Sequence, residues 1–206
     1  MIKRQLLFNA LTLSLLVTVT NSQATDLTAK EPHAIVEHLH MGLLESMRQY
    51  GQESLRTRFT HLKPTITTLF DFDTISRIVC GRSWLEMDGT TKDEFIQAFR
   101  KLSIATYAHN FSSYDGESFK VTEVKIESSR AIVKTELLRS SGRNISLTYM
   151  LRKNSDQWKI INVISEGVSD LSLKRSEYGT IIKSRGIKAL INNLKEQLAK
   201  YPLKTS

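Results

Sequence analysis

Hydrophobic and polar residues alternate along residues 145–152, which predicts a β-strand with one buried face. The buried set is Ile145, Leu147, Tyr149 and Leu151. Polar residues at 153–156 indicate a turn. The following stretch, 158–164, is apolar on both faces and is therefore expected to be an inner strand covered on both sides. In that strand Trp158, Ile160 and Ile164 are predicted to face one way, and Ile161 and Val163 the other.

Two earlier segments, 119–126 and 131–138, also show strand-like alternation and are separated by Ser128 and Ser129. Short turns join all of these strands, which predicts an antiparallel meander. In the second segment Val133, Thr135 and Leu137 are expected to share one face.

Apolar residues recur at every third or fourth position on both sides of the predicted sheet, which is the period of an amphipathic helix. The predicted helices span 32–50, 55–64, 71–81, 91–111, 168–186 and 187–198. Pro64 is expected to stop or bend the second helix. Residues 91–94 (TKDE) match a capping box, which predicts that the long fourth helix begins there. The sequence thus predicts one α+β domain with a twisted antiparallel sheet of four to five strands, wrapped by N- and C-terminal helices.

Residues 1–24 have the pattern of a secretory signal peptide. Lys3 and Arg4 precede an apolar stretch at 6–20, and small residues occupy the positions before a cleavage point after Ala24. The alternative is an uncleaved anchor helix. We expect an exported domain over 25–206.

The formal net charge is +8, and loss of Lys3 and Arg4 leaves 8 − 2 = +6 on the mature chain. A basic surface suits anionic membranes or acidic proteins, or serves only solubility. No nucleic-acid-binding motif accompanies the charge, so no nucleic-acid partner is expected. The single cysteine, Cys80, cannot form an internal disulfide and is interpreted as a small buried hydrophobic residue.

The sequence carries no recognised catalytic or nucleotide-binding motif. His33, Glu37 and His40 would share one helix face and could begin a metal site, but a solvated face is the favoured interpretation. We therefore expect neither an enzyme nor a cofactor.

Aromatic residues of the long helix, from Phe95 to Phe111, are expected to face the apolar side of the sheet from Leu147 to Ile160. Two such surfaces can close into a solid core or leave a pocket. Periodicity alone does not separate these outcomes, and from the residues alone a solid core is favoured.

Several segments in order resemble the MlaC family of periplasmic phospholipid-shuttle proteins, also known through toluene-tolerance operons. The segments are IVCG with Trp84, FIQAFRKLSIATY at 95–107, YDG at 114–116, RKNS with Trp158, ISEGVS at 164–169, YGT at 178–180 and SRGI at 184–187. The stretch TYAHNFSSYDGESFKV also resembles the hopanoid-associated HpnM branch of that family.

The resemblance implies a sheet wrapped by helices around an apolar cavity that holds acyl chains. It further implies periplasmic transfer between an outer-membrane lipoprotein complex and an inner-membrane ABC transporter complex, by a protein we expect to be a monomer. By matching position, the resemblance implies lipid contacts at Val79, Tyr107, Tyr149 and Val168. Periodicity alone adds Phe99, Phe111, Leu147 and Ile160.

Three alternatives stay open at this point. The chain could carry hopanoids or other cyclic lipids instead of phospholipids. It could be an enzyme with a similar cupped sheet, or an adaptor with a solid core and no ligand.

Overall fold

The computed structural model describes residues 31–203, so the predicted signal peptide at 1–24 lies outside the described residues. The helices are α2 (Pro32–Tyr50), α3 (Leu55–Leu69), α4 (Phe72–Cys80), α5 (Ser83–Glu86), α6 (Gly89–Asn110) and α7 (Asp170–Ala199). The strands are β1 (Ser118–Glu127), β2 (Arg130–Leu138), β3 (Ile145–Asn154), β4 (Gln157–Ser165) and β5 (Val168–Ser169).

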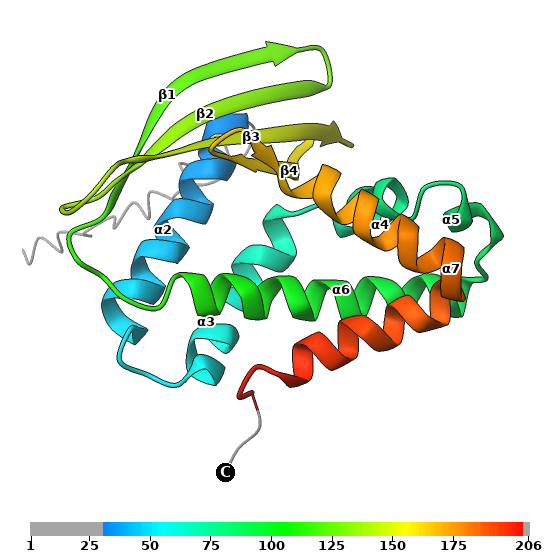
Figure 1. Cartoon of the computed structure of the whole chain (residues 1–206). Helices are drawn as coiled ribbons and strands as arrows, with labels where there is room; N and C mark the ends of the chain where they lie inside the picture. The colour runs from blue at the N-terminus through cyan, green and yellow to red at the C-terminus, as the bar shows by residue number, and fades with distance from the viewer. Residues whose placement is uncertain (1–30, 204–206) are drawn as a thin grey trace, which may run out of the picture.

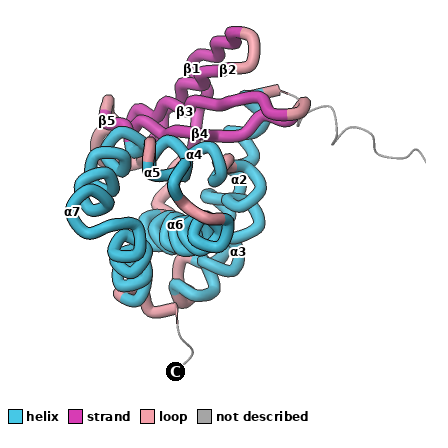
Figure 2. The backbone as a smooth tube through the Cα atoms, turned by 90° about the vertical axis from the view of Figure 1, so that its right-hand side faces the viewer, coloured by secondary structure: helices cyan, strands magenta, loops and turns pink. Residues whose placement is uncertain are grey.

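The strands form one open antiparallel sheet in the order β1-β2-β3-β4-β5. Each strand pairs with its neighbour in sequence, which confirms the predicted meander and the α+β class. The curved sheet lies on one side of the helices, which form a second layer beneath it (Figures 1 and 2).

The inner face of the sheet follows the predicted alternation in β2 and β3. Val133 pairs with Tyr149, and Thr135 pairs with Leu147. All four side chains are buried. Because directly paired residues share a face, these strands present a continuous buried surface to the helices.

Strand β4 departs from the predicted alternation because it contains a bulge. The pairing steps from Leu151–Ile160 to Met150–Asn162, which leaves Ile161 without a partner in β3. The extra residue reverses the alternation beyond it. Val163 consequently shares a face with Tyr149 and Ile160. The alternation of the sequence had predicted Ile164 on that face.

Helix α6 lies at the centre of the helical layer, where it packs against α3, α4 and α7 (Figure 2). Helix α2 runs down from the sheet and contacts β1, β2 and β4 (Figure 1). Phe95, Leu62 and Leu194 are fully buried where these helices meet. This part of the molecule is a solid core.

Two predicted helix boundaries are wrong. Helix α3 continues through Pro64 to Leu69, because Ile66 and Leu69 are buried in the next turn and their packing outweighs the hydrogen bond that proline cannot donate. Helix α6 begins earlier than the predicted capping box. The Asp88 side chain is its N-cap and accepts a hydrogen bond from the Thr91 backbone N–H at 2.7 Å.

Two other predicted boundaries, at Asp71 and at Gly186, are confirmed, whereas α7 begins at Asp170 and not at the predicted residue 168. Asp71 caps α4 by accepting a hydrogen bond from the Thr74 N–H at 2.9 Å. Gly186 breaks α7 into two helical halves, with φ 80° and ψ 170°. Between residues 31 and 203, no helix is both long enough and apolar enough to cross a bilayer.

Candidate functional site

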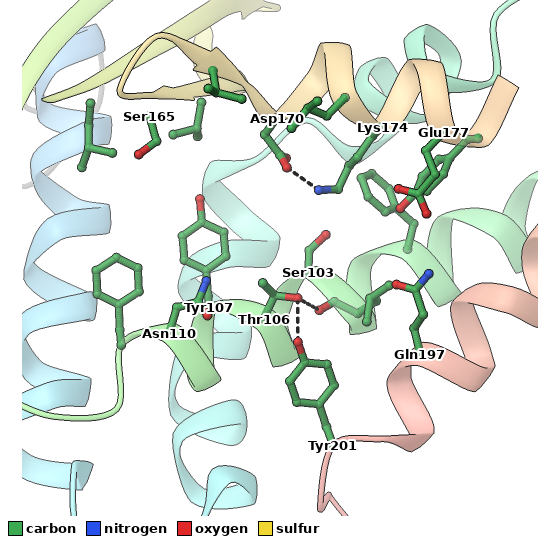
Figure 3. A pocket seen from close by; sticks show the side chains of 18 of the residues that line it. Ser103, Thr106, Tyr107, Asn110, Ser165, Asp170, Lys174, Glu177, Gln197 and Tyr201 are labelled. Atoms are coloured by element: carbon green, nitrogen blue, oxygen red, sulfur yellow. Dashed lines mark hydrogen bonds and ion pairs between the residues drawn. The ribbon is translucent and has the colours of Figure 1, made fainter. Parts of the chain in front are cut away.

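A cavity of about 920 Å³ lies between the inner face of the sheet, helix α6 and both halves of α7. It is formed where the sheet and the helices do not close on one another. Figure 3 shows side chains from α6, from the end of β4 and from both halves of α7 lining this space. For brevity we call it the main cavity.

The wall of the main cavity formed by α6 and the sheet follows from helix and strand periodicity. Helix α6 contributes residues spaced by three or four positions, which lie on one face. These are Phe99, Leu102, Ser103, Thr106, Tyr107 and Asn110, with Phe111 at the helix end. The sheet contributes Leu137, Ile145, Leu147, Tyr149, Val163 and Ser165. Val163 reaches this wall because of the bulge in β4.

Helix α7 supplies a polar rim. Asp170, Lys174 and Glu177 follow at helical spacing on its first half, and Asp170 forms an ion pair with Lys174. Val168 and Leu173 lie beside them and are 53% and 58% exposed. Apolar side chains exposed beside charged ones mark this side as a mouth of the cavity.

The chain end beyond α7 closes the other side of the main cavity. The Tyr201 hydroxyl lies 3.4 Å from Thr106 Oγ1. Thr106 donates its own proton to the Leu102 carbonyl at 2.9 Å, so Tyr201 is the donor in the first contact. Gln197 donates to Asn193 Oδ1 at 2.7 Å on the same side (Figure 3).

Tyr149 is held from behind the cavity wall by His40 of α2. The Tyr149 hydroxyl lies 3.0 Å from His40 Nε2, and the imidazole stacks on Phe119 at a centroid distance of 3.9 Å. His40 is buried. The predicted solvated face therefore does not include His40, and the residues described do not group three or more potential metal ligands anywhere.

Burial disfavours the charged forms of these groups. It lowers the pKa of His40 to about 3 and raises the pKa of Tyr107 and of Tyr149 well above the usual tyrosine value. Near neutral pH, the histidine and both tyrosines are therefore neutral. The inner wall thus presents uncharged side chains, mainly rings and aliphatic groups, with Ser103, Thr106 and Asn110 among them.

Six of the eight sequence-predicted site residues line the main cavity. They are Phe99, Tyr107, Phe111, Leu147, Tyr149 and Val168. Val79 and Ile160 do not line it. Both are buried in the solid core, on α4 and β4 respectively.

Several polar lining residues were missed by the sequence reasoning. Ser103, Thr106 and Asn110 could have been found, because they repeat at helical spacing from Phe99. Gln197 and Tyr201 carried no comparable signal. They are brought to the cavity by the break at Gly186, which directs the second half of α7 back along α6 (Figure 1).

The arrangement suits binding better than catalysis. The cavity lies near the upper end of the roughly 300–1,000 Å³ typical of small-ligand sites. Cys80 is buried outside the cavity lining, and burial raises its pKa to about 12, so it is a poor nucleophile. Asp170 and Lys174 neutralise one another at the rim.

An antiparallel sheet and a helical layer that enclose a mainly apolar cavity place the molecule among the cavity-containing α+β proteins. The chain belongs to the MlaC family, since the family's sequence profile, described as MlaC protein, matches residues 38–196. In structure it is similar to a phospholipid-binding protein from Ralstonia solanacearum that was solved in complex with a phospholipid. The TM-score is 0.72 at 19% sequence identity, covering 87% of this chain and 97% of that chain.

Proposed function

We propose that this protein is a periplasmic phospholipid carrier that shuttles lipid between the outer and inner membranes. The main cavity, with its apolar wall and charged rim, is the observation that carries the proposal. Membership of the MlaC family supports it, as does the likeness to a protein solved with a phospholipid. The proposed mature form is one lipid-binding domain over 25–206, exported by the signal peptide at 1–24.

The energetics of such a carrier follow from the cavity. Moving a methylene group from water into an apolar site is favourable by roughly 0.8 kcal/mol. Phe99, Tyr107, Leu147 and Tyr149 would contact acyl chains, while the rim around Lys174 would meet the head group. The cavity would shield the acyl chains from water while the carrier diffuses between membranes.

Release requires a partner, because tight binding alone would trap the lipid. We propose an outer-membrane lipoprotein complex and an inner-membrane ABC transporter complex as the donor and acceptor. The basic net charge of the mature chain would increase the rate of encounter with acidic partner surfaces. Within this scheme the protein acts as a monomer, without a cofactor and without catalysing a reaction.

The test is to identify the native cargo. The protein is purified from a bacterial periplasm without detergent, extracted with organic solvent and examined by mass spectrometry. Phospholipid in near-stoichiometric amount is the expected result. A hopanoid would favour the HpnM-like alternative suggested by residues 106–121. Absence of lipid, together with no uptake from phospholipid vesicles, would overturn the carrier proposal.

A further inference from the structure

A second hollow of about 40 Å³ lies behind the wall of the main cavity. We call it the inner hollow. It exceeds the roughly 10–15 Å³ that one water molecule requires. Ile66 of α3, Phe72 and Ile75 of α4, and Phe70 between these helices contribute to its wall, and all four are buried. Residues 161–163 of β4 and the start of α7 complete the lining, so the inner hollow lies between the sheet and the helices, with its apolar part on α3 and α4.

Two aromatic residues of α6 stand between the inner hollow and the main cavity. Both spaces are lined by Phe99, Ser103, Tyr107, Val163 and Asp170, of which Phe99 and Tyr107 carry the largest side chains. The Tyr107 ring lies 5.7 Å from Phe70, and the Phe99 ring lies 5.8 Å from Phe72, measured between ring centroids. In Figure 3 the Tyr107 ring rises from α6 toward the end of β4.

Two of the polar side chains beside the inner hollow, those of Asn162 and Asp170, are engaged within the protein, and Ser103 and the Tyr107 hydroxyl also line it. The Asn162 amide donates to Ser169 Oγ at 3.0 Å and accepts from the Leu171 backbone N–H at 3.1 Å. Asp170 is paired with Lys174. Because Asn162 and Asp170 already have partners and the buried residues of α3 and α4 supply hydrocarbon, most of this wall suits an acyl chain.

We propose that Phe99 and Tyr107 form a partition that limits how deeply an acyl chain enters this protein, and so sets its preference for chain length. The inference rests on the proposed function as a phospholipid carrier. A chain in the main cavity ends against the two rings. If the rings were removed, the inner hollow and the space they occupied would accept further methylene groups.

The experiment compares chain lengths directly. Delipidated protein is incubated with vesicles that contain equal amounts of dimyristoyl- and distearoyl-phosphatidylcholine, and the bound lipids are quantified by mass spectrometry. Tyr107→Ala should raise the bound ratio of long to short lipid by about fourfold for each additional methylene that it buries. Tyr107→Leu, which keeps a larger apolar side chain, should shift the ratio in the same direction by less.

Phe111→Ala is the matched control. Phe111 lines the main cavity and stacks on Tyr107 at 6.0 Å, but it does not line the inner hollow. Its removal enlarges only the main cavity and should raise the ratio by less than Tyr107→Ala does. Adding Ile75→Phe to Tyr107→Ala fills the inner hollow and should restore the wild-type ratio.

The outcomes separate the two proposals. An unchanged ratio in both Tyr107 variants, with lipid still bound, would overturn the partition alone. An equal shift in Phe111→Ala would also overturn it, because any enlargement of the cavity would then suffice. Wild-type protein that takes up neither lipid would overturn the carrier function and the partition together.

Discussion

His40 shows how one buried polar side chain can support a hydrophobic wall. It lies on α2, outside the main cavity, yet its ring contacts Phe119 and its Nε2 atom meets the hydroxyl of the cavity residue Tyr149. The tyrosine hydroxyl thereby has a partner on the side away from the cavity. A phenylalanine at position 149 would leave His40 without this partner, at a cost of about 1–3 kcal/mol.

The burial of His40 predicts a loss of stability in acid. Its pKa is about 3 in the folded protein and about 6.5 when unfolded. The unfolded chain therefore binds the proton first, so stability present above pH 6.5 is lost as the pH falls toward 3. We expect this residue to lower the free energy of unfolding by about 2 kcal/mol between pH 7 and pH 5.

Urea denaturation at the two pH values measures this effect. His40→Gln keeps a polar group beside Tyr149 without titrating in this range, and its unfolding free energy should change less with pH. His38→Gln, at an exposed position on the same helix, is the control and should behave as the wild type does. Equal pH dependence in all three proteins would contradict the assignment to His40.

At the scale of elements, the break in α7 places the second half of this helix against the main cavity, where it supplies part of the lining. The first half of the helix supplies Asp170 and Lys174, and the second half supplies Asn193 and Gln197. The two halves meet at Gly186, whose φ of 80° and ψ of 170° fall in a region that is essentially restricted to glycine. A continuous straight helix would carry its second half away from α6.

Gly186→Ala should therefore destabilise the protein by about 1–3 kcal/mol through backbone strain. No atom lies within 4 Å of the position that the new Cβ would occupy, so a steric clash contributes nothing. Gly179→Ala is the matched control, since Gly179 is helical and equally open. It should raise stability by up to about 1 kcal/mol. Thermal unfolding measures the stability of both variants. A Gly186→Ala variant more stable than the wild type would show that the fold does not require the break in α7.

At the scale of the whole molecule, the protein combines a solid core with a cavity along the same strand. Leu147 and Leu151 share the inner face of β3, and both are buried. Leu147 lines the main cavity, whereas Leu151 is packed in the core and pairs with Ile160. The same substitution at the two positions should therefore have different consequences.

Leu151→Asp should unfold the protein, because an unpaired carboxylate in a packed core costs several kcal/mol. Leu147→Asp places its carboxylate at the wall of the main cavity, where water can reach it, so we expect it to fold but to bind phospholipid at least about tenfold more weakly. Circular dichroism and lipid extraction measure the two effects. Ile126→Asp, at a position on β1 that is 49% exposed, should leave both unchanged. Unfolding of Leu147→Asp would contradict the cavity assignment.

The periodicity of the sequence determined most of the elements. Alternation in β2 and β3 identified their buried faces, and helical spacing from Phe99 to Phe111 identified the face of α6 that lines the main cavity. Gly186 was identified as a helix boundary for the same reason, since the apolar spacing restarts after it. These features depend on interactions between residues close in sequence, so the local pattern contains them.

Only the tertiary structure decided whether the apolar faces touch or stand apart. Phe99 and Phe95 lie one turn apart on α6, yet only Phe99 reaches the main cavity. Val79 and Ile160 are as apolar as the lining residues, but α4 and β4 pack them into the core. The bulge at Ile161, the continuation of α3 past Pro64 and the inward position of His40 likewise depend on distant partners. A local pattern specifies which side chains avoid water, whereas the spacing between packed layers specifies whether protein atoms or an enclosed space lies opposite them.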